Sequence, residues 1–186
     1  MERKISKRQL RNILIVGVIV ALIGAIWLFK KQSQEAPSQA DPQISFDKVN
    51  GYFPLDITGK IDLENLKSYG LPIIIDFGSD SCGPCVEMAP ALQTLNKEMA
   101  GKAIILFADV YKYQEAMDGF PIQVIPTQIF IDAEGNPYQP GENSSVQYVQ
   151  YNFRDTGELA FTAHQGTITE EQLREALLEM GVSSDD

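Results

Sequence analysis

Hydrophobic positions along this 186-residue chain form one long N-terminal run followed by a series of short segments. Residues 12–29 carry no charge and are almost all apolar, which is typical of a membrane-spanning helix. After a polar stretch, short β-branched runs alternate with segments whose apolar residues recur every three to four positions. This alternation predicts an α/β domain, in which buried strands are joined by amphipathic helices.

The segments beyond the polar stretch predict six strands and four helices. The strands are expected at about 44–46, 73–77, 103–110, 127–131, 146–153 and 159–164, and the helices at 62–69, 83–100 and 113–119, with a last one from Thr169. Asp62 is the expected N-cap of the first helix, and Gly101 is expected to end the long one. In the last helix Leu173, Leu177 and Leu178 are expected to face inward.

The N-terminal apolar run is interpreted as an uncleaved membrane anchor. Five Lys or Arg residues precede it and two follow it, which predicts an N-terminus inside and a domain outside the cytoplasm. At ~1.5 Å per residue the run spans roughly 25 Å, so Trp27 and the flanking lysines are expected at the membrane interface. A cleavable signal peptide is the alternative, because Ser38-Gln-Ala40 resembles a cleavage site, although it lies far beyond the run.

Charge is distributed unevenly between the two ends of the chain. The predicted organisation is a basic cytoplasmic segment at 1–11, a transmembrane anchor at 12–29, a linker at 30–43, one domain at 44–182 and a frayed tail at 183–186. Residues 1–31 carry a net charge of +6 and the remainder −16. The strong negative charge of the residues after position 31 argues against nucleic-acid binding. Such a charge is typical of a solvated surface that keeps a domain soluble.

The residues with distinctive chemistry are concentrated where the strand at 73–77 gives way to the long helix. A small polar turn is followed there by Cys82-Gly83-Pro84-Cys85, which contains the only two cysteines of the chain. Residues three apart share a helix face, so the two sulfurs can form a disulfide. Free N–H groups and the helix dipole favour a thiolate at Cys82, while Cys85 lies one turn deeper. The spacing therefore predicts a two-thiol redox switch.

Three alternatives compete with redox exchange at this pair. A zinc site needs about four ligands, and the chain offers two cysteines and one distant histidine. That histidine, His164, is interpreted as a surface residue. No metal site is therefore predicted. A purely structural disulfide that closes so small a loop would stabilise the fold little. A redox-silent domain of the same fold is the third alternative.

Further residues around the motif resemble the thioredoxin family. Asp76 resembles the buried acid on the strand below the family's cysteines, Pro90 its helix-kinking proline, Ile125-Pro126-Thr127 its cis-proline loop and Gly166 the junction before its last helix. The resemblance covers roughly residues 44–180. It implies a thioredoxin fold, with a central mixed β-sheet flanked by helices, here preceded by one N-terminal transmembrane helix.

Catalytic roles are expected for three residues of this arrangement. Cys82 is the expected attacking nucleophile because it lies nearer the surface and the helix start, and Cys85 is the expected resolving thiol. Asp76 is expected to be buried without an ammonium partner, so desolvation should raise its pKa. A carboxyl of that kind is suited to pass a proton to or from Cys85 through water.

The expected substrate-binding residues flank the cysteines. Gly83 leaves room for a partner backbone, and Pro84 is pre-set for the first helical turn. The resemblance implies a cis peptide bond before Pro126 and a loop that lies against Cys82. The backbone of Ile125 is then able to pair with an extended substrate strand.

Four positions around the sulfurs depart from the family pattern. Ser81 stands where the family usually has tryptophan, Gly78 where it often has an aromatic residue, Phe107 where it has a lysine near the buried acid, and Val86 where a cation follows the second cysteine. Each change removes bulk or positive charge around the sulfurs.

A stretch of some eighteen residues, 137–154, is inserted where the family usually runs straight from a hairpin turn into its final strand. Its segment 146–153 is rich in β-formers, which predicts an extra strand or hairpin. The turn at 132–135 ends a strand that leads away from the cysteines, so it is expected opposite the active site. The insertion is interpreted either as a docking surface or sheet-edge lid, or as a stabilising decoration.

Together these features predict a membrane-anchored thiol–disulfide oxidoreductase that reduces protein disulfides outside the cytoplasm through a Cys82/Cys85 dithiol. The Gly-Pro pair resembles that of reducing thioredoxins, and no cofactor besides the redox-active disulfide is expected. The expected partners are disulfide-containing proteins and a polytopic membrane thiol transporter that donates electrons. The expected location is the bacterial cytoplasmic membrane. The alternatives are an extracytoplasmic disulfide oxidase or isomerase and a redox-silent binding module.

Overall fold

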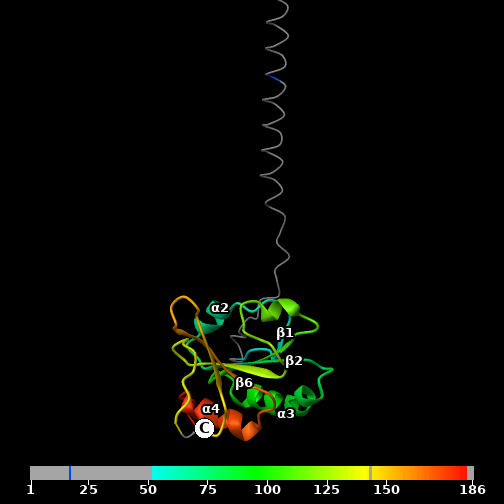
Figure 1. Cartoon of the computed structure of the whole chain (residues 1–186). Coiled ribbons are helices and arrows are strands. Elements are labelled where there is room, and N and C mark those ends of the chain that lie inside the picture. Colours follow the sequence, from blue (N-terminus) through cyan, green and yellow to red (C-terminus); the bar gives the residue numbers. More distant parts are fainter. Residues whose placement is uncertain (1–16, 18–51, 143, 184–186) are drawn as a thin grey trace, which may run out of the picture. The chain divides into compact units, whose positions relative to one another are not determined.

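The computed structural model describes Gly17, residues 52–142 and residues 144–183 (Figure 1). Apart from Gly17, the predicted anchor at 12–29, the linker and the strand at 44–46 lie outside the described residues. Among the residues that the structure does describe, no helix has the length and hydropathy that a membrane crossing requires.

Six strands form one mixed sheet in the order β1-β3-β2-β4-β6-β5. Their bounds are β1 Asp56–Ile57, β2 Ile73–Gly78, β3 Ile104–Asp109, β4 Thr127–Ile131, β5 Val149–Asn152 and β6 Leu159–Gln165. β1, β3 and β2 run parallel to one another, and β4, β6 and β5 are each antiparallel to their neighbours. The parallel centre is buried on both faces, which explains why every residue of β2 is buried.

Helices cover both faces of this sheet. Their bounds are α2 Leu63–Lys67, the 3₁₀ helix Gln114–Met117, α3 Gly83–Glu98 and α4 Glu170–Glu179. In Figure 1, α3 and α4 lie together on one side of the sheet and α2 lies on the other. The sheet thus has an α3/α4 face and an α2 face, and each is sealed by its own group of buried apolar residues.

Local sequence signals account for the helix ends. The Asp62 side chain accepts a hydrogen bond of 3.0 Å from the Asn65 N–H, as expected of an N-cap. Thr169 and Gln172 form a capping box at the start of α4, where the Thr169 side chain and the Gln172 amide bond each other's backbone N–H groups. Gly101 follows α3 with a φ of +74°, which a residue with a side chain rarely adopts.

The insertion contributes a strand and part of the core. Its β5 pairs with β6 at the edge of the sheet, which confirms the predicted extra strand. Tyr138 and Val146 are buried against Phe130 and the inner side of α4, so the insertion packs over the α3/α4 face. The Tyr138 hydroxyl also donates to Glu179 of α4. These contacts favour the stabilising interpretation of the insertion.

Three sequence expectations need correction. Leu178 was expected to face inward but is 52% exposed. The side of α4 that packs on the sheet is a narrow stripe, and its buried residues are Leu173, Ala176 and Leu177. The predicted helix at 113–119 is a single 3₁₀ turn. Strand β1 was not expected, because two residues give no periodicity and its place in the sheet comes from pairing with Phe107 and Ala108.

Candidate active site

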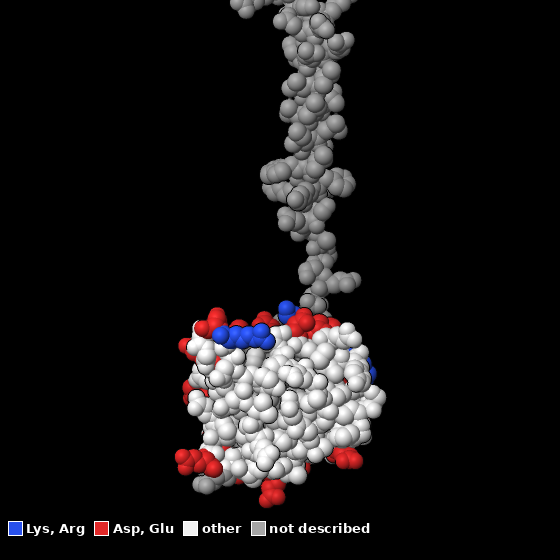
Figure 2. Space-filling model, viewed as in Figure 1, with Lys and Arg blue, Asp and Glu red and all other residues white. Residues whose placement is uncertain are grey.

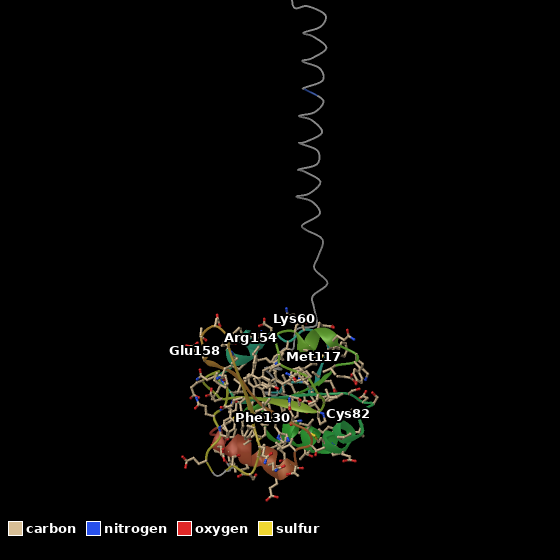
Figure 3. The ribbon with its side chains drawn as sticks, viewed as in Figure 1. Lys60, Cys82, Met117, Phe130, Arg154 and Glu158 are labelled. Atoms are coloured by element: carbon tan, nitrogen blue, oxygen red, sulfur yellow. A yellow bond between two sulfur atoms is a disulfide. The ribbon has the colours of Figure 1, made fainter. Side chains whose placement is uncertain are left out.

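The two cysteines lie between the end of β2 and the first turn of α3. Cys82 is labelled in Figure 3. Cys82 is the N-cap of α3, and its Sγ lies 3.3 Å from the N–H of Cys85. The two sulfurs form a disulfide, with Cα atoms 5.2 Å apart. The N–H that points at Cys82 Sγ is one of the free donors of the first helical turn, which stabilise a negative charge there.

The two sulfurs differ in their access to solvent. Cys82 is half-buried, and Gly83 and Pro84 beside it are exposed. Cys85 is only 2% exposed, because it belongs to the buried stripe of α3 that continues with Met88 and Leu92. An incoming protein can therefore reach Cys82 first, while Cys85 is reached through Cys82.

Cys85 rests directly on the backbone of Gly78. A side-chain carbon built on Gly78 would lie 3.2 Å from Cys85 Sγ and 2.9 Å from the Phe107 ring. The glycine is therefore required for the close approach of sulfur and strand. Because Gly78 and Asp76 are two residues apart on β2, they project to the same face, about 7 Å from each other.

Asp76 is fully buried on this face. Desolvation raises its pKa from 3.8 to about 7, although a hydrogen bond from Gln128 acts in the opposite direction. The sequence expectation of a buried acid with a raised pKa is confirmed. Phe107 lies opposite Asp76 in the β2–β3 pairing, so an apolar ring stands beside the carboxyl.

Gln128 is a partner of Asp76 that the sequence interpretation missed. Its Nε2 donates to Asp76 Oδ1 over 2.7 Å, and the two residues are opposite each other in the β2–β4 pairing. The available signal was a single amide at an alternating position within the apolar segment 127–131. That signal shows which side of β4 is polar, but not which strand lies next to it.

The peptide bond between Ile125 and Pro126 is cis, as expected. Thr127 pairs with Phe77, so this loop lies at the same end of the sheet as the turn that carries Cys82. The carbonyl of Pro126 accepts a hydrogen bond from the Gly166 N–H over 2.9 Å. Within the described residues, neither the N–H nor the carbonyl of Ile125 has a backbone partner, so both remain available for pairing.

Asp109, at the end of β3, ties the active-site turn to the next loop. It is 5% exposed, and its carboxylate accepts hydrogen bonds from the N–H groups of Asp80, Tyr111 and Lys112. Burial alone would raise the pKa of Asp109, but these bonds outweigh it and lower the pKa. Lys112 also pairs with the Asp80 side chain. Sequence reasoning did not single out Asp109, because its partners lie in two separate loops.

A pocket of about 200 Å³ adjoins the buried sulfur. Cys85, Val86 and Phe107 are among its lining residues, and Val86 is 52% exposed. Two of the departures from the family pattern therefore give this side of the site an apolar character. Ser81, a third departure, is exposed and lies 3.0 Å from the Ser79 hydroxyl.

His164 lies on β6, opposite Gln128 in the sheet. It is half-buried rather than a free surface residue, and its ring nitrogens lie 2.9 Å from the Gln147 carbonyl and 3.1 Å from the Thr167 carbonyl. It therefore connects the insertion to the start of α4. Within the part of the chain that the structure describes, no group of three His, Cys, Asp or Glu residues is arranged to hold a metal ion.

Comparison with known proteins places this site in a family. Residues 60–150 match the family model described as Thioredoxin. The chain is 34% identical to thioredoxin-1 of Drosophila melanogaster over 59 residues, which are 32% of this chain and 55% of that protein. It is 36% identical to thioredoxin 1 of Chlorobaculum tepidum over 61 residues, which are 33% of this chain and 60% of that protein.

A solved structure, that of Fasciola hepatica thioredoxin, is aligned with a TM-score of 0.47 and 24% identity, covering 68% of this chain and 99% of that one. The chain spans little more than half the length of the first curated relatives that it matches. The family model includes the whole active-site turn, both cysteines and the cis-proline loop. The part of the chain that carries the site, residues 60–150, therefore matches the thioredoxin family.

Proposed function

We propose that this protein is a membrane-anchored thiol–disulfide oxidoreductase that reduces disulfides of other proteins outside the cytoplasm. The observation that carries the proposal is the arrangement of the two sulfurs: a half-buried Cys82 at the N-terminus of α3, bonded to a buried Cys85. A pair that differs in access in this way divides the reaction into an intermolecular and an intramolecular step.

In the first step the Cys82 thiolate attacks one sulfur of a substrate disulfide. A bond forms between Cys82 and that sulfur, and the other substrate sulfur leaves as a thiolate. The free N–H groups at the start of α3 stabilise the charge on Cys82 before attack.

In the second step Cys85 loses its proton and attacks Cys82. The Cys82–Cys85 disulfide forms, the second substrate thiol is released, and the substrate has gained two electrons. Asp76 is the proposed acceptor of the Cys85 proton through a water molecule, since it lies on the same face of β2 as the glycine under Cys85 Sγ.

Substrate binding is proposed at the rim that surrounds Cys82. An extended segment of the substrate would pair with the free backbone groups of Ile125 beside the cis bond to Pro126, while the exposed surface of Gly83 and Pro84 leaves room for its chain. Figure 2 shows a face of the domain that is largely free of charged side chains, with acidic and basic groups at its margins. A broad uncharged surface suits substrates of varied sequence.

The proposed location is the cytoplasmic membrane of a bacterium, with residues 1–11 inside and the domain outside. The support is the uncharged run at 12–29 and the excess of cations before it. A reductant in that position needs electrons from within the cell, so a polytopic membrane thiol transporter is the proposed donor.

Trapping of mixed disulfides tests the enzymatic proposal. In full-length Cys85→Ser the first step proceeds and the second does not, so mixed disulfides with substrate proteins should accumulate and disappear on adding dithiothreitol. The matched control is the double variant Cys82→Ser/Cys85→Ser, which should trap nothing. If Cys85→Ser traps no more than this control, the domain is a redox-silent module.

Alkylation of living cells tests the direction of electron flow. Thiol-reactive maleimide added before lysis labels reduced cysteines, and a mass shift of the full-length protein counts them. Mostly reduced Cys82 and Cys85 support the reductase, and a mostly oxidised pair supports the oxidase. A maleimide that does not cross membranes should label the same cysteines if the domain faces outward.

A further inference from the structure

Four residues form a row across the sheet on its α3/α4 face. Phe107 of β3 lies opposite Asp76 of β2, Asp76 lies opposite Gln128 of β4, and Gln128 lies opposite His164 of β6. Residues opposite each other in a sheet project to the same face. The buried carboxyl therefore has an aromatic ring on one side and an amide on the other.

The amide of Gln128 is held in one orientation. Its Nε2 lies 2.7 Å from Asp76 Oδ1, 3.4 Å from the Gly166 carbonyl oxygen and 3.9 Å from Met88 Sδ, and all three of these atoms accept hydrogen bonds. Both Gln128 and Asp76 are completely buried, so water does not compete from the surface. The donor end of the amide is thus directed at one carboxyl oxygen.

The two oxygens of the Asp76 carboxyl are consequently unlike each other. Oδ1 accepts the amide hydrogen, whereas Oδ2 has no partner among the described protein atoms, and neither has the Gln128 Oε1. A proton on Oδ1 would oppose the Gln128 N–H that already points at that oxygen, whereas Oδ2 has no donor in front of it. The geometry favours Oδ2 as the oxygen that carries the proton.

We propose that Gln128 is a positioning residue for proton transfer, which holds Asp76 Oδ1 and leaves Asp76 Oδ2 to exchange a proton with Cys85. The inference rests on the function proposed above. The step converts a Cys85 thiol and an Asp76 carboxylate into a Cys85 thiolate and an Asp76 carboxylic acid, and the thiolate then attacks Cys82. Gln128 touches neither sulfur; it acts through the carboxyl.

Among the described residues, the groups besides Gln128 that face the carboxyl come from three elements. β3 contributes Phe107, α3 contributes Cys85 and Met88, and β6 contributes His164 on the far side of Gln128. Cys85 and His164 are the titratable members of this set. The Gln128 amide is therefore the direct hydrogen-bond donor to the carboxylate, while Phe107 occupies the place where the family has a lysine.

The proposal predicts a shifted pH profile when the donor is removed. Gln128→Met keeps the length of the side chain and loses the N–H, so the ionised carboxylate loses the hydrogen bond from Gln128. The midpoint at which the resolving step accelerates with rising pH should move upward by about one to two pH units, the size expected for one hydrogen bond to a charged group. Gln128→Glu, which is nearly isosteric, should shift it at least as far by adding a second carboxyl.

The experiment follows the resolving step in the full-length protein in detergent. Single-turnover quench of the mixed disulfide gives the rate from pH 5 to 9, and infrared difference spectroscopy of the carboxyl gives the titration of Asp76 independently of catalysis. Thr162→Val is the matched control, because Thr162 is an equally buried polar residue of the α3/α4 face without a hydrogen bond to Asp76. It should leave both midpoints unchanged.

Two further results decide between a positioning and a merely structural role. If Gln128→Met and Gln128→Glu slow the reaction equally at all pH values with unmoved midpoints, Gln128 only supports the fold and the proposal is overturned. If Gln128→Met still shifts the profile when Asp76 is already Asn, the amide acts elsewhere and the proposal is also overturned. Failure of the oxidoreductase proposal is recognised separately, by the absence of trapping in Cys85→Ser while the infrared titration still reports the amide's effect on Asp76.

Discussion

The two faces of the central sheet are built from different kinds of residue. On the α2 face the strands contribute an almost entirely apolar surface, which includes Ile75, Phe77 and Leu106. On the α3/α4 face the row opposite α3 contains Asp76 and Gln128, both fully buried, among apolar neighbours such as Ile74. The α2 face therefore buries hydrocarbon and one hydroxyl, that of Thr127, which donates to the Val124 carbonyl, while the other face buries a carboxyl and an amide.

This difference separates stability from chemistry within one sheet. A buried carboxyl costs free energy unless it is hydrogen-bonded, so it is unfavourable for folding where nothing requires it. Asp76 lies on the face against which Cys85 packs. On the α2 face, none of the described strand residues in the core is ionisable. The α2 face contributes packing alone, and the α3/α4 face also carries the carboxyl that we propose as the proton acceptor.

The largest expected effect comes from moving a carboxyl to the apolar face. Ile75→Asp places a charge one residue from Asp76 but on the side without a hydrogen-bond donor, and should destabilise the domain by about 5 kcal/mol, enough to unfold many domains. Urea unfolding of the full-length protein, followed by circular dichroism, measures this. Near-native stability of the variant would show that the two faces tolerate a charge equally.

Removing the carboxyl from the other face should have the opposite effect at neutral and higher pH. Because the folded-state pKa of Asp76 is about 7, above its ordinary 3.8, the folded protein binds the proton more tightly, and wild-type stability falls as pH rises from about 4 to about 7. The loss reaches about 4 kcal/mol above pH 7.

Asp76→Leu should therefore flatten the dependence of unfolding free energy on pH, with a gain at pH 8 that is absent at pH 4. Turnover should fall in the same variant. Asp76→Asn is the control that keeps a polar group of similar size. Unfolding curves of wild type and Asp76→Leu that stay parallel from pH 4 to pH 8 would contradict the assignment of the titration to Asp76.

A smaller effect is expected where the insertion meets the α3/α4 face. Tyr138→Phe removes the hydroxyl that donates to Glu179, while the ring remains packed near Phe130 and Tyr148, so the free energy of unfolding should fall by about 1.5 kcal/mol. Burial raises the pKa of Tyr138, which keeps the hydroxyl a donor. Tyr111→Phe, at a 66% exposed site, is the control, and equal losses in the two variants would argue that the contact with α4 contributes nothing.

The smallest effect should be found on the outer side of α4. Leu178→Ser should change the free energy of unfolding by no more than about 0.5 kcal/mol, because the side chain is already half in solvent. Leu177→Ala, one residue earlier and 1% exposed, should cost about 2–5 kcal/mol. Thermal or urea unfolding of the pair distinguishes the two sides of the helix, and similar losses would reverse the assigned orientation.

Much of the local structure was predictable because its causes lie within a few residues. Strand β4 occupies Thr127–Ile131 as predicted, and Asp62 and Thr169 cap their helices. The cis peptide bond before Pro126 was expected from the family resemblance instead. The orientation of Leu178 was wrong because helical periodicity identifies a stripe, whereas the width of the buried stripe depends on what packs against it.

The contacts of the site could not be predicted in the same way. Asp76 and Gln128 are 52 residues apart, and their pairing depends on the register between β2 and β4. Asp109 gathers donors from two loops, and His164 contacts a carbonyl of the insertion 17 residues away. No local sequence pattern indicates contacts between residues so far apart, so the sequence predicted that Asp76 is a buried acid but did not predict its hydrogen bond with Gln128.

By itself, the order of residues determined the redox pair, its place at the start of a helix, most of the strands and helices, and the acidic character of the domain. Helix caps, turn residues and apolar periodicity depend on residues that are close together in the sequence, so these features can be predicted from short segments. Only the tertiary structure decided that Cys85 rests on Gly78, that Gln128 holds Asp76 and that the insertion packs over the sheet. Those contacts arise from strand register and burial, which depend on the whole domain folding at once.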